Sequence, residues 1–158
     1  MNPKIREILQ KADDPIGSEI PYEDHDKFPW KELSLEINQI KDLLKNKLGL
    51  DFECDDGVQD ASFFADLRIF HEKTDSLKRI IQIADIAIRF SNFGKLFSLW
   101  SNLDGFEVKF PIKEIVNIVK GFNWKYIPKK ELHEIYDGKK VSMRNGKYTW
   151  WDRFFDYT

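Results

Sequence analysis

The strand-like segments of this chain are grouped in its middle, and helical patterns lie on both sides of the group. The strand patterns are short runs rich in β-branched and aromatic residues, at residues 50–55, 63–71, 80–90, 95–100 and 106–110. Consecutive strands with no helix between them pair as antiparallel neighbours, because parallel strands need long crossovers. This order predicts an α+β fold, in which an antiparallel sheet of about five to six strands packs against helices from the N-terminal and C-terminal thirds.

The clearest helical pattern covers residues 30–48. Its apolar residues recur at positions 30, 33, 37, 40, 44 and 48, and Gly49 follows where a helix commonly ends. Three shorter helices are predicted at residues 3–12, 111–120 and 128–136. In the last of them the spacing directs Leu132, Ile135 and Tyr136 inward.

The chain closes with a predicted β-hairpin, because Asn145-Gly146 separates residues 141–144 from residues 147–150. Near the other end, residues 13–29 contain three prolines and a glycine and form an irregular acidic segment. A length of 158 residues fits one domain, and no linker or repeat divides it. The sequence therefore predicts a single globular domain over residues 1–158.

Composition excludes several classes of protein. Cys54 is the only cysteine, so intramolecular disulfides and multi-cysteine zinc sites are excluded by count. The first residues lack the uninterrupted apolar run of a secretory signal, and no window is apolar enough to span a membrane. A formal net charge of −2 argues against nucleic acid as the partner. We expect a soluble, cytoplasmic protein that needs no cofactor.

Charge is unevenly distributed along the chain. Residues 13–26 hold six acidic side chains and no Lys or Arg, whereas residues 109–147 hold ten Lys or Arg and four acids. Such runs are commonly solvated surface, or the two regions attract each other. The alternative is electrostatic steering of a partner, in which Glu23, Asp24 and Asp26 would meet a basic surface.

Two weak constellations leave an enzymatic alternative open. His25 stands among carboxylates in Tyr22-Glu23-Asp24-His25-Asp26, and Cys54 would need His25, His71 or His133 as its base in a thiol enzyme. No spaced metal motif such as H-E-x-x-H occurs. With Leu50 and Phe52 on the same strand face, Cys54 is better interpreted as a small core residue. Residues 51–57 also fail the calcium-loop pattern, since Asp56 stands where glycine is required.

The C-terminal segment is unusually aromatic. Residues 148–157 contain six aromatic side chains, in Tyr148-Thr149-Trp150-Trp151-Asp152-Arg153-Phe154-Phe155-Asp156-Tyr157. One interpretation is a clasp that fills the core, with Asp152 and Arg153 pairing at its edge. The other is an exposed contact surface around Trp150, Trp151 and Arg153, since Trp and Arg are enriched at interfaces.

This ending, from Trp150 to Tyr157, resembles the immunity-type proteins encoded beside bacterial polymorphic toxins, small cytoplasmic proteins that each bind and block one toxin. The resemblance implies a non-enzymatic domain that binds a protein, such as a toxin domain with a basic surface. Glu23, Asp24, Asp26, Trp150, Trp151 and Arg153 would then contribute to the contact surface. Two alternatives remain open: a small hydrolase or transferase with a metal or thiol site, and a homo-oligomeric structural protein that pairs through an exposed sheet edge.

Overall fold

The computed structural model describes residues 1–13, 30–55, 64–91, 94–101, 109–139 and 143–155. Its centre is a five-stranded sheet with the strands in chain order, β1-β2-β3-β4-β5. The strands are β1 (Glu53–Asp55), β2 (Phe64–Thr74), β3 (Ile80–Ser91), β4 (Leu96–Trp100) and β5 (Lys125–Tyr126). The first four form an antiparallel meander, and β5 runs parallel to β4. The α+β prediction is confirmed, although the sheet is mixed rather than wholly antiparallel.

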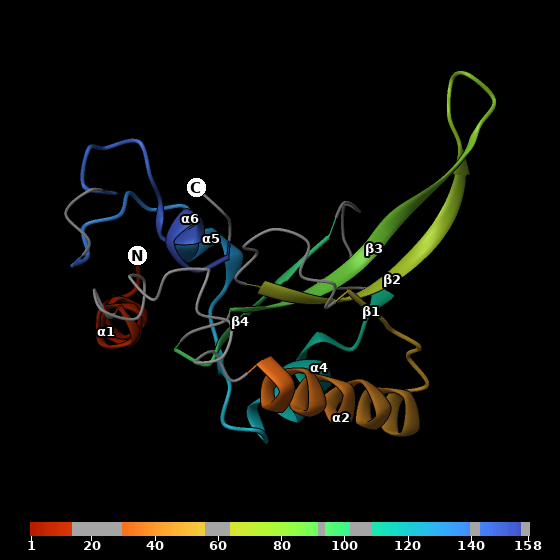
Figure 1. Ribbon diagram of the computed structural model, residues 1–158, viewed down its shortest axis with the longest axis horizontal. Coiled ribbons are helices and arrows are strands. Elements are labelled where there is room, and N and C mark those ends of the chain that lie inside the picture. The colour runs from red at the N-terminus through yellow and green to blue at the C-terminus, as the bar shows by residue number, and fades with distance from the viewer. Residues whose placement is uncertain (14–29, 56–63, 92–93, 102–108, 140–142, 156–158) are drawn as a thin grey trace.

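Two helices cover one face of the sheet, α2 (Trp30–Leu48) and α4 (Ile112–Lys120) (Figure 1). Their apolar residues enter the larger hydrophobic core, together with alternate residues of the strands. Ile37, Ile40 and Leu44 are fully buried, as the helical spacing predicts. Gly49 follows α2 with φ +68°, a conformation in which a Cβ would be strained, so glycine ends this helix as expected.

A second core lies at the other end of the molecule and joins the two chain termini. It brings together α1 (Pro3–Ala12), α5 (Lys129–Leu132) and α6 (Trp150–Phe155). Leu96 of β4 belongs to this core, and the next residue, Phe97, belongs to the larger one. Because successive side chains of a strand point to opposite faces, β4 ties the two cores together.

Several local predictions are wrong in detail. The predicted strand at 106–110 lies mostly outside the described residues, and its end, Lys109 and Phe110, belongs to no strand. The predicted helix at 128–136 stops at Leu132, and Ile135 is 61% exposed rather than buried. The helix ends there because the backbone N–H of Tyr136 donates a hydrogen bond to the carbonyl of Tyr148 rather than to a carbonyl of the helix.

The predicted C-terminal hairpin does not form among the described residues. A turn leads directly into α6, and residue 149 makes only an isolated bridge to residue 135. Thr149 caps α6 locally, because its Oγ1 accepts a hydrogen bond from the Asp152 backbone N–H at 3.4 Å, and its own backbone N–H donates to the Asp152 carboxylate in return. Asp152 therefore pairs with Thr149 rather than with Arg153. The irregular acidic segment of residues 13–29 lies, apart from Asp13, outside the described residues.

Candidate functional site: a projecting two-stranded arm

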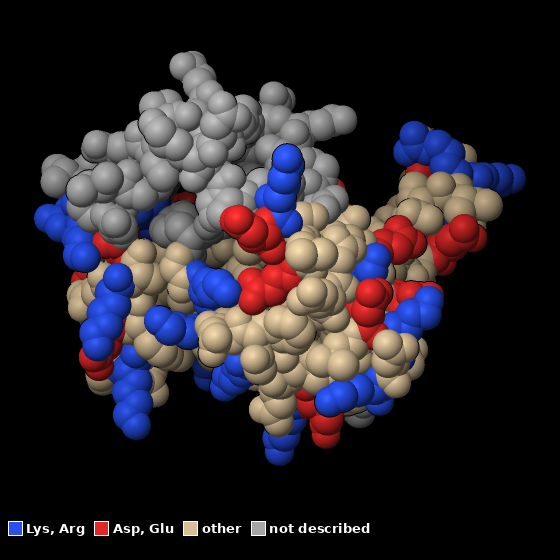
Figure 2. All heavy atoms as spheres, turned by 60° about the horizontal axis from the view of Figure 1, so that its bottom comes forward, with Lys and Arg blue, Asp and Glu red and all other residues tan. Residues whose placement is uncertain are grey.

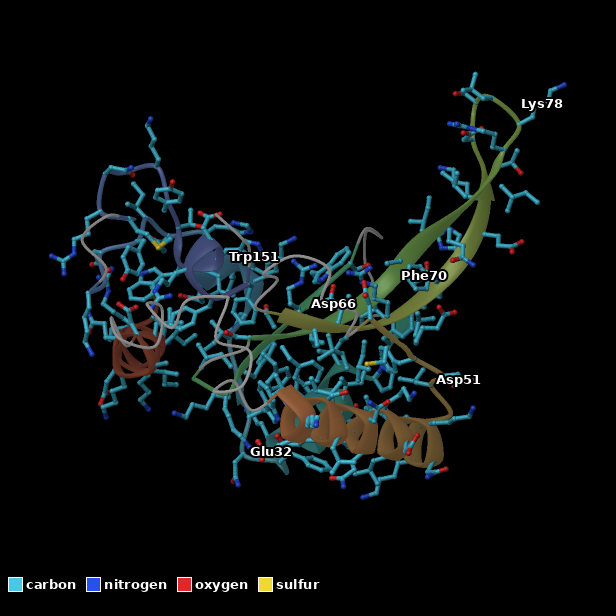
Figure 3. All side chains as sticks on the ribbon, viewed as in Figure 1. Glu32, Asp51, Asp66, Phe70, Lys78 and Trp151 are labelled. Carbon is cyan, nitrogen blue, oxygen red and sulfur yellow. The ribbon has the colours of Figure 1, made fainter. Side chains whose placement is uncertain are left out.

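The strands β2 and β3 continue beyond the sheet as a two-stranded arm, which we define as residues 69–84 (Figure 1). The neighbouring strands are too short to accompany them. β1 pairs with β2 only at residues 66–68, and β4 pairs with β3 only at residues 87–90. The arm curves away from the body, with Phe70 near its base and Lys78 at its far end (Figure 3).

A bulge and a small polar cluster mark the base of the arm. The register shifts between Ile69 and Phe70, which leaves Asp85 as the extra residue on β3. The Asp85 carboxylate is buried, accepts a hydrogen bond from Lys109 Nζ at 2.9 Å, and contacts His71 Nδ1. Burial raises the pKa of Asp85, but the hydrogen bonds from Lys109 and His71 outweigh it and hold the pKa below its ordinary value. The contacts of the Asp85 carboxylate with Lys109 and His71 therefore hold the bulge at the base of the arm in place.

The turn at the tip is held by one carboxylate. Asp75 Oδ1 accepts hydrogen bonds from the backbone N–H groups of Leu77 and Arg79, both at 2.9 Å. Its Oδ2 accepts from Arg79 Nε at 2.8 Å. The backbone hydrogen bond from Arg79 is the main reason that the pKa of Asp75 lies below its ordinary value. Lys78 takes the left-handed conformation that the turn requires, with φ 60°.

The arm exposes large apolar side chains. Leu77 is 70% exposed in the turn, and on β3 Ile80 is 71% and Ile81 38% exposed. Cations accompany them at the tip, where Figure 2 shows blue side chains at the end of the arm. Lys73 is exposed and lies across the ribbon from Ile81. The nearby carboxylate of Asp75 forms an ion pair with Arg79. The tip thus offers an apolar surface with a cationic border, on a turn ordered before any contact is made.

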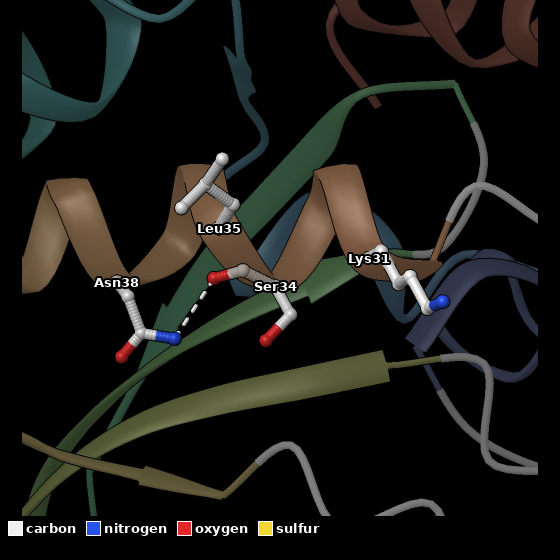
Figure 4. Close-up of a pocket in the computed structure, with 4 residues that line it drawn as sticks. All are labelled: Lys31, Ser34, Leu35 and Asn38. Atoms are coloured by element: carbon white, nitrogen blue, oxygen red, sulfur yellow. Dashed lines mark hydrogen bonds between the residues drawn. The ribbon is translucent and has the colours of Figure 1, made fainter.

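Elsewhere on the surface, cationic and acidic side chains are interspersed, as the view of the α2 and α4 side shows (Figure 2). A hollow of about 490 Å³ lies on α2, lined by Lys31, Ser34, Leu35 and Asn38 (Figure 4). Asn38 donates a hydrogen bond to the Ser34 carbonyl at 2.9 Å. All four residues come from a single helix, so they do not converge on an enclosed ligand.

A second polar cluster lies on the sheet, on the side away from the larger core. Asp66 is 1% exposed and accepts hydrogen bonds from Arg68 and Arg89, with Arg89 binding through Nε and Nη2 at 2.8 Å each. Arg68 also pairs with Asp55 at 3.0 Å. Arginine commonly binds a carboxylate in this two-pronged way, and here it ties β2 to β3. The cluster is a structural tie between strands.

Trp151 contacts this cluster from α6. The guanidinium of Arg89 and the ammonium of Lys129 both lie over Trp151, at 5.6 Å and 5.4 Å from its ring centroid, and both also lie over Trp100. Trp151 is half-buried, so part of its ring remains on the surface. Of the C-terminal aromatic residues expected to contact a partner, it is the one that the structure leaves accessible in part.

Trp150 and Arg153 are buried, which corrects their assignment to a contact surface. Trp150 is 0% exposed and packs against Tyr136 and Phe154. Arg153 is 6% exposed, and its Nε donates to Asp13 Oδ1 at 2.8 Å. A buried side chain cannot meet a partner while the core is intact, so the clasp interpretation describes these two residues. Glu23, Asp24 and Asp26 lie outside the described residues.

The side chains that the enzymatic alternative needs are not brought together among the described residues. Cys54 pairs across β1 and β2 with Leu67, and His71 is four residues farther along β2, roughly 13 Å at the rise of a strand. His133 stacks on Trp151 instead. Within the described ranges no group of three His, Cys, Asp or Glu side chains could hold a metal ion. His25 lies outside those ranges.

Sequence reasoning missed the arm as a site. It ended the second strand at His71, whereas β2 runs on to Thr74, and it gave Leu77, Ile80 and Ile81 no role. The signal that was present is the short Asp75–Arg79 turn between two runs of strand-forming residues. That signal predicts a hairpin, but the projection depends on the lengths of β1 and β4.

Comparisons with models of protein families, with curated proteins and with solved structures gave no significant match. Within the described residues, no helix combines the length and apolar character needed to cross a membrane. What the chain binds is therefore inferred from its own residues.

Proposed function

We propose that this chain is a non-enzymatic, cytoplasmic domain that binds another protein, in the manner of an immunity-type inhibitor that blocks a toxin. The observation that carries the proposal is the arm, where Leu77 and Ile80 are 70% and 71% exposed on an ordered turn. Burying such side chains in a partner contributes about 25 cal/mol per Å² of apolar surface removed from water. A turn that is already ordered also reduces the entropy lost on binding.

The remaining candidate residues fit the same proposal. Trp151 keeps part of its ring on the surface. Glu23, Asp24 and Asp26 would speed encounter with a basic partner such as a toxin domain, because complementary charges raise association rates. The apolar arm would then slow dissociation, which is where most differences in affinity arise.

The experiment first identifies a partner by affinity capture from the native host at low and moderate salt, and then measures its binding to purified variants. Leu77→Ser should weaken binding at least tenfold, as expected for an apolar residue central to a contact. Leu35→Ser is the matched control, since Leu35 is 63% exposed on α2, away from the arm. Equal affinities of both variants and the unaltered protein would contradict the role of the arm.

Charge is tested separately. Neutralising Glu23, Asp24 and Asp26 together should slow association with the same partner and flatten its dependence on salt, while dissociation changes little. An unchanged association rate at low salt would remove the acidic segment from the contact. If the protein inhibits a toxin, toxin activity should return in parallel with the loss of affinity.

A further inference from the structure

Among the residues that the structure describes, no strand lies beside the outer edge of β3 in the arm. β4 pairs with β3 only up to Ala87, and Ser101, directly after β4, donates a hydrogen bond to the Asp85 carbonyl. From there to the turn at Arg79, none of the strands that the structure describes pairs with this edge of β3. Five residues, Ile80 to Ala84, therefore have no strand beside this edge among the described parts of the chain, and we name this segment the free edge.

The free edge carries no charge. Its residues are Ile80, Ile81, Gln82, Ile83 and Ala84. Natural proteins commonly protect exposed edges with charged side chains, bulges or prolines, because unpaired backbone groups recruit other strands. The opposite strand of the arm has such protection in Glu72 and Lys73. An uncharged, isoleucine-rich edge is the arrangement that favours pairing with another strand.

We propose that the free edge pairs with the same edge of a second copy of this chain, antiparallel and about a twofold axis at Gln82. The two ends of the edge select this register. At one end, the Ser101 hydroxyl already bonds the Asp85 carbonyl, and at the other end the turn reaches Arg79. Gln82 is therefore the middle residue of the segment that can pair. A twofold contact uses the same surface on both subunits, and this edge opposes no like charges when it meets itself.

The register places apolar residues together. Ile81 would lie opposite the partner's Ile83, and Ile80 opposite the partner's Ala84. Directly opposed residues of an antiparallel pair point to the same face and interact. Four isoleucines would therefore lie side by side on one face, covering Ile81, which is 38% exposed in the single chain. The contact would also extend the arm into a four-stranded sheet.

The contact is small, and it shares Ile80, but not Leu77, with the apolar surface on which the proposed function rests. Five paired residues bury less surface than a stable interface of roughly 1,600 Å² needs, so the dimer should dissociate in the micromolar range. Leu77 lies in the turn, outside the free edge, and stays available to a different protein. Dimerisation can thus fail while partner binding persists, and partner binding can fail while the dimer persists.

Sedimentation velocity of the full chain tests the inference from about 1 µM to about 500 µM, a range that spans the expected dissociation constant. The weight-average mass should rise from one chain toward two. Gln82→Lys and Gln82→Glu each place like charges opposite one another at the twofold axis, and each should weaken the dimer roughly fivefold. An equimolar mixture of the two variants should restore dimerisation, because opposite charges then face each other.

Gln39→Lys and Gln39→Glu are the matched controls, since Gln39 is exposed on α2. They should leave the mass unchanged. Because Glu72 lies across the ribbon from Gln82, thermal unfolding of each Gln82 variant establishes that its fold is retained. A protein that stays monomeric at the highest concentration would overturn the inference. So would a mixture of Gln82 variants that dimerises no better than either variant alone.

Discussion

The buried contact between Asp13 and Arg153 gives the sharpest test of where the structure places the C-terminal segment. Asp13 is 0% and Arg153 6% exposed, and Nε lies 2.8 Å from Oδ1. The carboxylate also accepts from the Tyr136 hydroxyl at 2.7 Å and from the Lys139 backbone N–H at 2.6 Å. The pair therefore fastens α1 to α6 from opposite ends of the sequence.

Arg153→Met should lower the free energy of unfolding substantially. Removing one member of a buried ion pair typically costs 3–5 kcal/mol, because the remaining charge stays buried without its partner. Two donors still serve the Asp13 carboxylate, so we expect the lower end of that range, about 3 kcal/mol. With a urea dependence of about 2 kcal/mol per molar, the unfolding midpoint should fall by about 1.5 M.

Tryptophan fluorescence during urea unfolding measures the change. Arg79→Met is the control, because Arg79 is 69% exposed in its pair with Asp75 and should contribute less than about 1 kcal/mol. The double variant Asp13→Leu, Arg153→Met should be less destabilised than the sum of the two single variants, since neither charge is then left alone. If Arg153→Met lowers the free energy of unfolding by less than about 1 kcal/mol, the burial of Arg153 is refuted, and the residue is assigned to the surface instead.

Three further predictions concern single residues. Gly138→Ala should cost about 2 kcal/mol or more in urea unfolding, since its Cβ would overlap the Asp13 carboxylate. Gly49→Ala, which meets no neighbouring atom but keeps φ at +68°, should cost only about 1 kcal/mol in the same assay. The tip of the arm should be ordered above the ordinary pKa of aspartate, 3.8, and should loosen as pH falls through the lowered pKa of Asp75. The Arg79 amide signal in an NMR pH titration reports that loosening, and an unchanged signal down to pH 2 would contradict it.

Helices with strong periodicity were predictable from the sequence alone. Residues 30–48 form α2 with the expected bounds, because six apolar positions and a terminal glycine agree on one amphipathic helix. The predicted strands at 80–90 and 95–100 are also confirmed as β3 and β4, because β-branched and aromatic residues there leave no helical period. These predictions needed no knowledge of distant residues.

The C-terminal predictions failed because distant residues decide that region. Asn145-Gly146 is a strong hairpin signal, yet the residues that follow it turn into α6. Trp150 fills the second core, and Arg153 pairs with Asp13, which is 140 residues away in the chain. No local pattern encodes a contact over that separation, so tertiary packing overrode the propensity for a hairpin.

The sequence by itself determined the class of fold, the order of the main elements and the apolar faces of the helices, because periodicity and turn residues are local properties. Only the tertiary structure decided which aromatic and charged side chains are buried. It also decided that the arm projects, because projection depends on β1 and β4 ending before β2 and β3 do. The exposure of Leu77, Ile80 and Ile81 follows from that difference in strand length, which becomes visible only when the strands are paired.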